Sequence, residues 1–345
     1  MPVSLPQQMR GVVMSDYHEE LSDAIDGLAV RDLPVPTPGR GQVLVRVEAA
    51  PCNPSDLMLL LGKYGQLKTL PSVPGWEGAG TVVASGRGLM AGWLRGKRVA
   101  CALQEDRNGT WAQYVVAGAM QCIPLKKDVS FEQGACLIVN PLTAMGLLET
   151  ARRGGHAAAV HTAGASQLGR MMIAMAEQMN YPLVNLVRRE EQVQLLRSLG
   201  ATHVLNSSVE DIEEQLQETC QRLRATAAFE AVGGDLTGTV MNVLPRGSTV
   251  YVYGALSEEA CGNIDPIGLI FHDKTVTGFY LGEWLQKRGS WGILRAAGRV
   301  QRMILDGVIE TSFQRDASLD DVQEGLRQYV DHMTDGKLLI RPQAD

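Results

Sequence analysis

Residues 164–169 read Gly164-Ala165-Ser166-Gln167-Leu168-Gly169, and this stretch decides the fold. It follows a short apolar run at 157–161 and opens a Met- and Ala-rich segment that continues to residue 179. A strand, a glycine-rich turn and a helix in this order begin a dinucleotide-binding βαβ unit. The turn matches the GxGxxG pattern at its first and third glycines and has Ser166 in the middle place.

The chemistry of a bound pyrophosphate explains this spacing. Gly164 permits the tight turn, and Gly169 lets the helix pack closely on the strand. The start of the helix offers N–H groups and the positive end of its dipole to the phosphates, and Ser166 adds a hydroxyl. A degenerate match also fits a plain strand-to-helix turn, so the surrounding sequence has to separate the two interpretations.

The surrounding sequence alternates strand and helix patterns. Six short runs rich in Ala or β-branched residues are predicted strands, at 157–161, 183–187, 203–205, 227–231, 249–253 and 275–279. Helical patterns at 167–179, 190–199 and 209–223 lie between them. Strands joined by crossover helices form a doubly wound parallel sheet, so we expect an α/β fold with a six-stranded Rossmann domain.

The two flanks differ from this pattern. The N-terminal part is interrupted by Gly and Pro and has short alternating apolar runs, such as 42–48 and 80–84, which are typical of a β-rich domain. The tail combines helical stretches at 293–305 and 319–332 with a strand-like end at 337–340. It is too long to be an extension of the sheet, so we expect it to rejoin the N-terminal domain.

The end of the second predicted strand favours NADPH over NADH. Residues 185–187 lead directly into Arg188 and Arg189, and guanidinium groups at this place suit a 2′-phosphate, whereas an acidic residue would bind the ribose hydroxyl of NAD. The alternative is a solvated surface pair that Glu190 and Glu191 neutralise. The expected cofactor-binding residues are the six of the turn together with Arg188, Arg189, Val232, Gly233, Tyr253 and Gly254.

The composition excludes several classes of partner. The net charge of −6 and the pI near 5.6, with scattered Lys and Arg, argue against a nucleic acid or an acidic membrane surface. No apolar run approaches the ~18 residues of a membrane span. The six cysteines form no CxxC pair, so we expect reduced thiols and a cytoplasmic protein, and the N-terminal composition also allows a weak transit peptide.

Five further motifs stand in order along nearly the whole chain. They are Asn53-Pro54-Ser55-Asp56, Gly62-Lys63-Tyr64-Gly65, Pro74-Gly75-Trp76-Glu77-Gly78-Ala79-Gly80, Asn140-Pro141-Leu142-Thr143-Ala144 and Gly336-Lys337-Leu338-Leu339-Ile340. Together with the glycine-rich turn, this set resembles the medium-chain dehydrogenase/reductase superfamily, in its zinc-free quinone oxidoreductase and enoyl thioester reductase branches.

The resemblance implies a division into two domains. A GroES-like catalytic domain would comprise residues 1–128 and 290–345, and the Rossmann domain, 129–289, would be inserted between them. The resemblance also implies a substrate cleft at their junction and, commonly, a homodimer. We expect Trp76 and Trp284 to line the cleft, although Trp284 is equally suited to a core.

The resemblance also bears on metal binding. Zinc-dependent members place a Cys two residues before a Ser/Thr-Asp pair and a His between the Gly and Glu of the later motif. This chain has Asn53 and Trp76 at those places, no four-cysteine cluster, and six histidines without ligand spacing, so we expect no metal. Without a zinc Lewis acid, the reaction that fits is hydride transfer from NADPH to an electron-poor C=C bond, with a donor that stabilises the developing enolate.

Three catalytic residues are implied. In enoyl thioester reductases of the family the tyrosine of a Gly-x-Tyr-Gly segment is the proposed proton donor or carbonyl-orienting group, and Tyr64 matches it; a phenol is a neutral donor at pH 7. Asn53 and Thr143 are expected near the nicotinamide, where they would fix ribose and carboxamide. The alternatives are a packing role for Tyr64 and turn or helix-start roles beside Pro54 and Pro141 for the other two.

The sequence thus predicts an NADPH-dependent, zinc-independent reductase of activated C=C bonds that acts on a small electrophile, a 2-enoyl thioester or an enone. An NADPH:quinone oxidoreductase is the first alternative, because quinones are also electron-poor. A non-catalytic NADPH-binding protein is the alternative from another class, since a fold alone does not fix a function.

Overall fold

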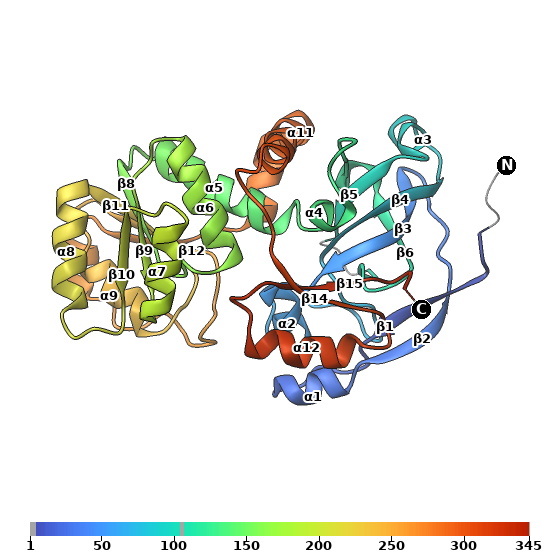
Figure 1. Ribbon diagram of the computed structural model, residues 1–345, viewed down its shortest axis with the longest axis horizontal. Coiled ribbons are helices and arrows are strands. Elements are labelled where there is room, and N and C mark those ends of the chain that lie inside the picture. Colours follow the sequence, from blue (N-terminus) through green and yellow to red (C-terminus); the bar gives the residue numbers. More distant parts are fainter. Residues whose placement is uncertain (1–4, 104–106, 345) are drawn as a thin grey trace. The chain divides into compact units, whose positions relative to one another are not determined.

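The structure is a computed structural model that describes residues 5–103 and 107–344. Its contacts divide the chain into two compact units (Figure 1). Unit 1 comprises Met1–Val139 and Gly289–Asp345, and unit 2 comprises Asn140–Arg288. The chain therefore leaves unit 1 once and returns to it once, as an inserted domain requires.

Unit 2, all of whose residues are described, is built on a six-stranded parallel sheet. Its strands are Ala158–His161 (β8), Leu183–Val187 (β9), His203–Asn206 (β10), Ala225–Glu230 (β11), Thr249–Val252 (β12) and Thr275–Gly278 (β13). They lie in the order β10-β9-β8-β11-β12-β13. This is the doubly wound order, which reverses direction beside the first strand.

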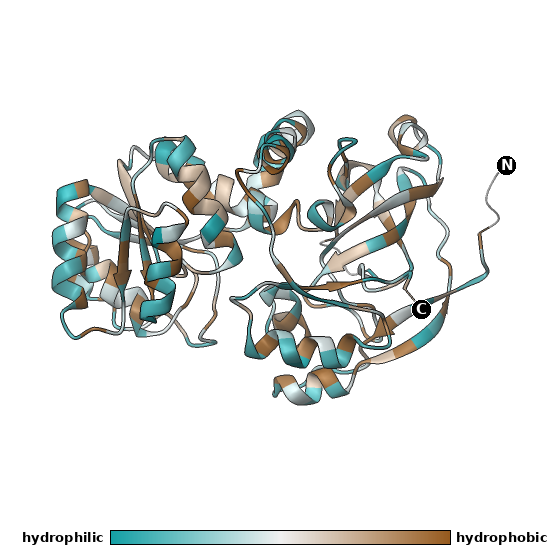
Figure 2. Cartoon of the chain, viewed as in Figure 1, coloured by the Kyte–Doolittle hydropathy of each residue, from teal (hydrophilic) through white to brown (hydrophobic). Residues whose placement is uncertain are grey.

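Helices cover both faces of this sheet. They are Val139–Arg153 (α5), Gln167–Gln178 (α6), Glu190–Ser198 (α7), Ile212–Leu223 (α8), Asp235–Val243 (α9) and Pro266–Phe271 (α10), and the first part of Leu281–Leu305 (α11). Helices α6 and α7 lie on one face, and α8 and α9 on the other (Figure 1). The inner strands β8, β9, β11 and β12 supply buried apolar side chains to a core shared with α8 and α9. Figure 2 shows brown, apolar segments among these strands and teal, polar segments on the outer helices.

Unit 1 is rich in β-structure. Its strands are Gln8–Val13 (β1), Ala29–Pro34 (β2), Gln42–Pro51 (β3), Glu77–Ser85 (β4), Arg98–Ala102 (β5), Tyr114–Gly118 (β6), Cys122–Pro124 (β7), Phe313–Ala317 (β14) and Lys337–Ile340 (β15). Its helices are Leu21–Asp26 (α1), Pro54–Leu60 (α2), Leu89–Leu94 (α3), Ala119–Gln121 (η1), Phe131–Ala135 (α4) and Val322–Asp331 (α12). Among the described residues, β14, β15, β3, β4, β5 and β7 pair in this order, and β6 pairs with β3.

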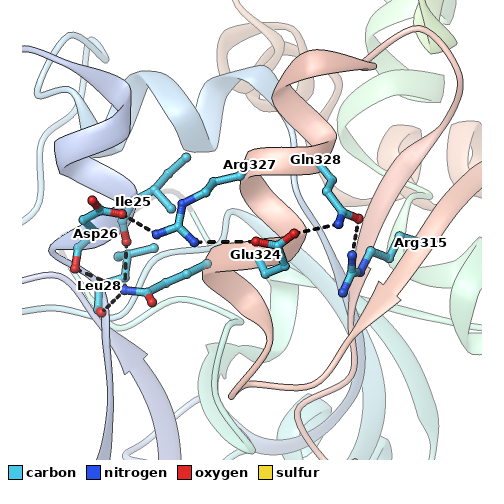
Figure 3. Close-up of polar contacts among 8 residues, drawn as sticks. Ile25, Asp26, Leu28, Arg315, Glu324, Arg327 and Gln328 are labelled. Carbon is cyan, nitrogen blue, oxygen red and sulfur yellow. Dashed lines mark hydrogen bonds and ion pairs between the residues drawn. The ribbon is translucent and has the colours of Figure 1, made fainter.

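The C-terminal tail rejoins unit 1, as predicted. Strand β15 pairs antiparallel with β3, and β14 pairs parallel with β15. Helix α12 lies against α1, where Arg327 forms an ion pair with Asp26 (Figure 3). On the same helix, the amide of Gln323 donates to the carbonyl oxygens of residues 25, 26 and 28. Helix and strand contacts together therefore attach the tail to the N-terminal part.

The borders between the units differ slightly from the predicted ones. Residues 129–139 belong to unit 1, because α4 packs on its sheet: Ala135 is buried against Ala49, Ala79 and Leu339. The return border falls at Gly289, where α11 contains a non-helical residue with φ of 62° that suits glycine. Within the described part of the chain, no helix has the length and apolar character that crossing a membrane requires.

Candidate active site

The glycine-rich turn begins α6 with very little free space. A Cβ atom on Gly169 would lie 2.3 Å from the carbonyl oxygen of Gly164, and a Cβ on Gly164 would lie 2.9 Å from the Cβ of Asn185. Ser166 is the N-cap of α6: its Oγ accepts from the N–H of Gly169 at 3.0 Å and donates to the carbonyl of Ala163 at 2.8 Å. The serine hydroxyl, predicted to face a phosphate, thus holds the turn itself together.

The other three residues of the turn, Ala165, Gln167 and Leu168, are buried. Their side chains belong to the interior of unit 2. Any contact that they make with a phosphate would therefore come from the backbone N–H groups at the start of α6, which is where a helix binds an anion.

Two exposed arginines follow the neighbouring strand. The N–H of Gly164 donates to the carbonyl of Leu186 at 3.1 Å, which brings the turn beside the end of β9. Arg188 and Arg189 come directly after that strand, and both are exposed. Neither forms an ion pair with Glu190, Glu191 or any other described residue. Their charges are therefore available to a ligand.

A buried acid that the sequence analysis overlooked fixes the turn after β11. The carboxylate of Glu230 accepts from the N–H groups of Val232 at 2.7 Å and Gly233 at 2.9 Å, and from the hydroxyl of Thr162 at 3.1 Å. Gly233 has a φ of 86°, which favours glycine. The sequence holds a local signal for this contact, because Glu230 stands two residues before Val232 and three residues before Gly233.

A histidine and a tyrosine meet at the ends of two further strands. The hydroxyl of Tyr253 lies 2.6 Å from Nε2 of His161. Burial lowers the pKa of His161 to about 3 and raises the pKa of Tyr253, so both groups are neutral near pH 7. A Cβ on Gly254 would lie 2.8 Å from the carbonyl oxygen of Ala231. The turns after β11 and β12 are therefore in contact.

All the predicted cofactor residues thus gather at one edge of the unit 2 sheet. They follow β8, β9, β11 and β12, which are neighbours in the sheet. The carboxyl ends of parallel strands around the point where the strand order reverses are where open α/β sheets bind ligands.

Thr143 lies on α5 in unit 2, and Trp284 packs against the same helix. Thr143 is buried near the start of α5. Trp284 is 9% exposed and packs on the same helix, because a Cβ on Gly146 would lie 3.0 Å from its ring. The guanidinium of Arg288 covers the Trp284 ring at 4.0 Å from its centroid. Within unit 2, Trp284 is therefore mainly a packing residue.

Tyr64 and Trp76 form an aromatic pair in unit 1. Their ring centroids are 4.9 Å apart, with the planes tilted by 39°. Trp76 is 5% exposed, and its indole N–H donates to the carbonyl of Ser55 at 3.1 Å. Tyr64 is half-buried. The structure therefore brings together these two predicted residues, which are separated by a loop in the sequence.

Asn53 lies in a buried polar network that the sequence analysis did not foresee. Its Nδ2 donates to Oε1 of Glu77 at 3.1 Å, and its Oδ1 accepts from the ammonium of Lys337. The carboxylate of Asp56 accepts from the N–H groups of Asn53 at 2.8 Å and Trp76 at 2.9 Å. These residues are at most 5% exposed. The Asn53 amide, expected at the nicotinamide, is thus bound to protein groups.

The network contains two carboxylates and one ammonium. Burial raises the pKa of Asp56 to about 7. The N–H donors of Asn53 and Trp76 and the charge of Lys337 act in the opposite direction and limit this increase. Burial also raises the pKa of Glu77, and Lys337 again opposes the shift. One ammonium does not fully compensate two buried carboxylates, so this cluster is electrostatically sensitive.

Comparison with known proteins places these features in a family. Residues 39–127 match the family described as Alcohol dehydrogenase GroES-like domain, and residues 168–294 match Zinc-binding dehydrogenase. The mitochondrial enoyl-[acyl-carrier-protein] reductase of Xenopus tropicalis is 30% identical over 299 residues, which cover 81% of this chain and 79% of that protein. A Mesorhizobium loti protein named as an NADPH:quinone reductase is 35% identical, with a TM-score of 0.92 over 99% of this chain and 100% of that one.

The chain belongs to the medium-chain dehydrogenase/reductase superfamily. The predicted family, the α/β fold with its GroES-like and Rossmann parts, and the oxidoreductase class are thereby confirmed. A mutant enoyl thioester reductase from Candida tropicalis shares the fold, with a TM-score of 0.78 over 97% of this chain and 99% of that one at 21% identity.

The zinc positions of this medium-chain reductase hold other residues. Asn53 and Trp76 stand where zinc-dependent members have Cys and His, and both have protein hydrogen-bond partners. Among residues 5–103 and 107–344, no group of three or more His, Cys, Asp or Glu side chains has the geometry of a metal site. All six cysteines are described, and none is in a disulfide; five of them are buried.

Proposed function

We propose that this medium-chain reductase transfers a hydride from NADPH to an electron-poor C=C bond, with 2-enoyl thioesters or enones as substrates. The observation that carries the proposal is the edge of the unit 2 sheet. There the glycine-rich turn lies beside Arg188 and Arg189, which have no ion-pair partner among the described residues. A nicotinamide dinucleotide with a 2′-phosphate is the ligand that needs both features.

The residues of unit 2 fit this cofactor. The start of α6 and the close packing at Gly164 and Gly169 suit a pyrophosphate, and Arg188 and Arg189 suit the 2′-phosphate. Glu230 keeps the Val232-Gly233 turn in shape. The Mesorhizobium loti relative is itself named for NADPH. When bound, NADPH supplies the hydride, and we assign to Thr143 the task of orienting its carboxamide.

Unit 1 supplies the groups for the electrophile. The phenol of Tyr64 is a neutral donor that can hydrogen-bond a carbonyl oxygen and stabilise the charge that develops on it during reduction. The ring of Trp76 holds the ring of Tyr64 from one side. We assign Asn53 a supporting role, because its amide joins Glu77 and Lys337. This chemistry places no electrophilic metal at the substrate, and we propose a zinc-independent reaction.

Enoyl thioesters and quinones are the two substrate classes to compare. The Xenopus relative is named for an enoyl thioester and the Mesorhizobium relative for a quinone. We favour the enoyl thioester because Tyr64 offers the donor that an enolate requires. The test measures NADPH oxidation with crotonyl-CoA and with a 1,4-quinone. Turnover of the quinone alone would establish the alternative, and turnover of neither, with NADPH bound, would indicate a non-catalytic NADPH-binding protein.

We further propose a cytoplasmic homodimer. Strand β13 lies at the edge of the unit 2 sheet, and its residues are largely exposed. The apolar side chains of Ile267, Ile270 and Phe271 on α10 are exposed as well. A free strand edge and exposed apolar side chains are the features by which a second copy can extend a sheet. Light scattering after size exclusion would give the mass, and metal analysis of the same sample would report its zinc content.

A further inference from the structure

The buried carboxylate of Glu77 connects β4 with α2 and with the start of α5. Glu77 begins β4, and its Oε1 accepts from Asn53, the N-cap of α2. Its Oε2 accepts from the N–H groups of Ile138 at 3.1 Å and Val139 at 2.9 Å. Lys337, which begins β15, donates to the other end of the Asn53 amide. One side chain that is 1% exposed thus joins β4, α2 and the start of α5, and it is linked to β15 through Asn53.

The position of Val139 gives this contact its importance. Val139 is the last residue of unit 1 and the first residue of α5. Thr143 lies about one turn further along the same helix. A carboxylate at the start of a helix satisfies N–H groups that have no partner within the helix, and it interacts favourably with the positive end of the dipole.

The same network extends to the aromatic pair. Asp56 accepts from the N–H of Trp76 and from that of Asn53, and Trp76 packs against Tyr64. Charged groups therefore hold both the backbone N–H of Asn53, through Asp56, and its side-chain amide, through Glu77 and Lys337. Displacement of Glu77 would loosen the start of α5 and disturb the Asn53 amide at the same time.

We propose that Glu77 is a positioning residue for the reaction: it binds the first N–H groups of α5, fixes the helical turn that carries Thr143, and is kept in place by Lys337 through Asn53. The inference rests on the proposed function, which assigns Thr143 to the nicotinamide. Glu77 acts through Thr143 and makes no contact with reacting atoms in this role.

A glutamine cannot replace this glutamate without conflict. Glu77 accepts three N–H donors on two oxygens. The amide of glutamine has one acceptor oxygen, so if that oxygen faces Val139, its NH₂ group faces the NH₂ group of Asn53. Rotation of the Asn53 amide would then direct its NH₂ group at the Lys337 ammonium. Some donor in the network is left unsatisfied in each arrangement.

The test compares Glu77→Gln with Glu132→Gln, measured as purified full-length proteins. Glu132 is a matched control, because its carboxylate lies in the same unit and its ion-pair partner is Arg341, at 2.6 Å. Four quantities are measured: kcat and KM on the active substrate, the Kd for NADPH, and amide hydrogen exchange of peptides that cover residues 136–148. Thermal midpoints confirm that each variant is folded at the assay temperature.

For Glu77→Gln we expect kcat to fall at least about tenfold, NADPH affinity to stay within about twofold, and exchange at the start of α5 to accelerate. Glu132→Gln should leave kcat and that exchange unchanged. Glu77→Asp keeps the charge and should recover part of kcat, and it carries the test if the glutamine variant does not fold. The proposal would be overturned if Glu77→Gln, or Glu77→Asp where the glutamine variant does not fold, kept the wild-type kcat or the wild-type amide hydrogen exchange at the start of α5. If the wild type reduces no substrate, the proposed function fails, and exchange alone decides whether Glu77 holds α5.

Discussion

The hydroxyl of Tyr253 lies 2.6 Å from Nε2 of His161, and this contact connects the ends of β12 and β8 across β11, the strand that lies between them. His161 is fully buried. It lies at the same sheet edge as the glycine-rich turn, so its charge state matters for any phosphate bound there.

His161 should make unit 2 less stable in mild acid. Burial lowers its pKa from 6.5 to about 3, so between these values the unfolded chain binds a proton that the folded chain does not. Stability from this group is therefore present above pH 6.5 and is lost as the pH falls. Relative to His161→Gln, the wild type should lose about 2 kcal/mol of unfolding free energy between pH 7 and pH 5.

Denaturant titrations at several pH values measure this difference. The exposed His272 offers a control, since its ring meets solvent in the folded state, and His272→Gln should run parallel to the wild type. A constant difference between the wild type and His161→Gln across this range would mean that His161 binds its proton equally in the folded and the unfolded protein, and would contradict a lowered pKa.

Asp56 should give a dependence of opposite sign in unit 1. Burial raises its pKa from 3.8 to about 7, so between these values the folded chain holds a proton that the unfolded chain releases. The contribution of this group is present below pH 3.8 and declines as the pH rises through 7, by up to about 1.4 kcal/mol per pH unit. The unfolding free energy of the wild type minus that of Asp56→Asn should fall from pH 4 to pH 7. Asp128→Asn, at an exposed position, should leave this slope unchanged.

The contrast between Glu230 and Lys337 explains how far the sequence could predict the site. The unit 2 strands were predictable because each is a short segment rich in Ala or β-branched residues that alternates with a helical pattern, and β9 has the predicted bounds. Glu230 binds amides two and three residues away, so its role was in principle visible. Lys337 and Asn53 are 284 residues apart in the chain. They meet only because β15 pairs with β3, which no local pattern encodes.

Gly169→Ala should damage the turn, whereas Gly298→Ala should stabilise the protein. A Cβ at Gly169 would lie 2.3 Å from the Gly164 carbonyl oxygen, and relieving that overlap should cost about 1–3 kcal/mol and weaken NADPH binding. Gly298 lies in α11, where a Cβ would have no atom within 4 Å, so alanine should add about 0.5–1 kcal/mol through helix propensity. Unfolding titrations and NADPH fluorescence measure both effects. Equal NADPH affinity in the two variants would contradict the role given to the turn.

Arg188→Ser should convert cofactor preference. Loss of a charge-assisted hydrogen bond to a phosphate costs about 1.5–3 kcal/mol, so NADPH should bind about 10- to 150-fold more weakly while NADH binding stays constant. Arg197→Ser, at an exposed position in the last turn of α7, controls for the loss of one positive charge. Titrations at equal ionic strength compare the two cofactors. A wild type that binds NADH more tightly than NADPH would refute the role of the arginine pair.

Tyr64→Phe separates hydrogen bonding from packing at the aromatic pair. Phenylalanine keeps the ring that lies 4.9 Å from Trp76 and removes only the hydroxyl, so the fold of unit 1 should persist. If the phenol stabilises the developing enolate, kcat/KM on the active substrate should fall about 10²- to 10³-fold, as on removal of an oxyanion donor, with little change in NADPH affinity. Tyr114→Phe, a half-buried tyrosine on β6, should retain full activity. Near wild-type kcat/KM in Tyr64→Phe would leave Tyr64 a packing residue. Hydride transfer would then proceed on a substrate already electron-poor enough to need no donor, which is the behaviour that a quinone would give.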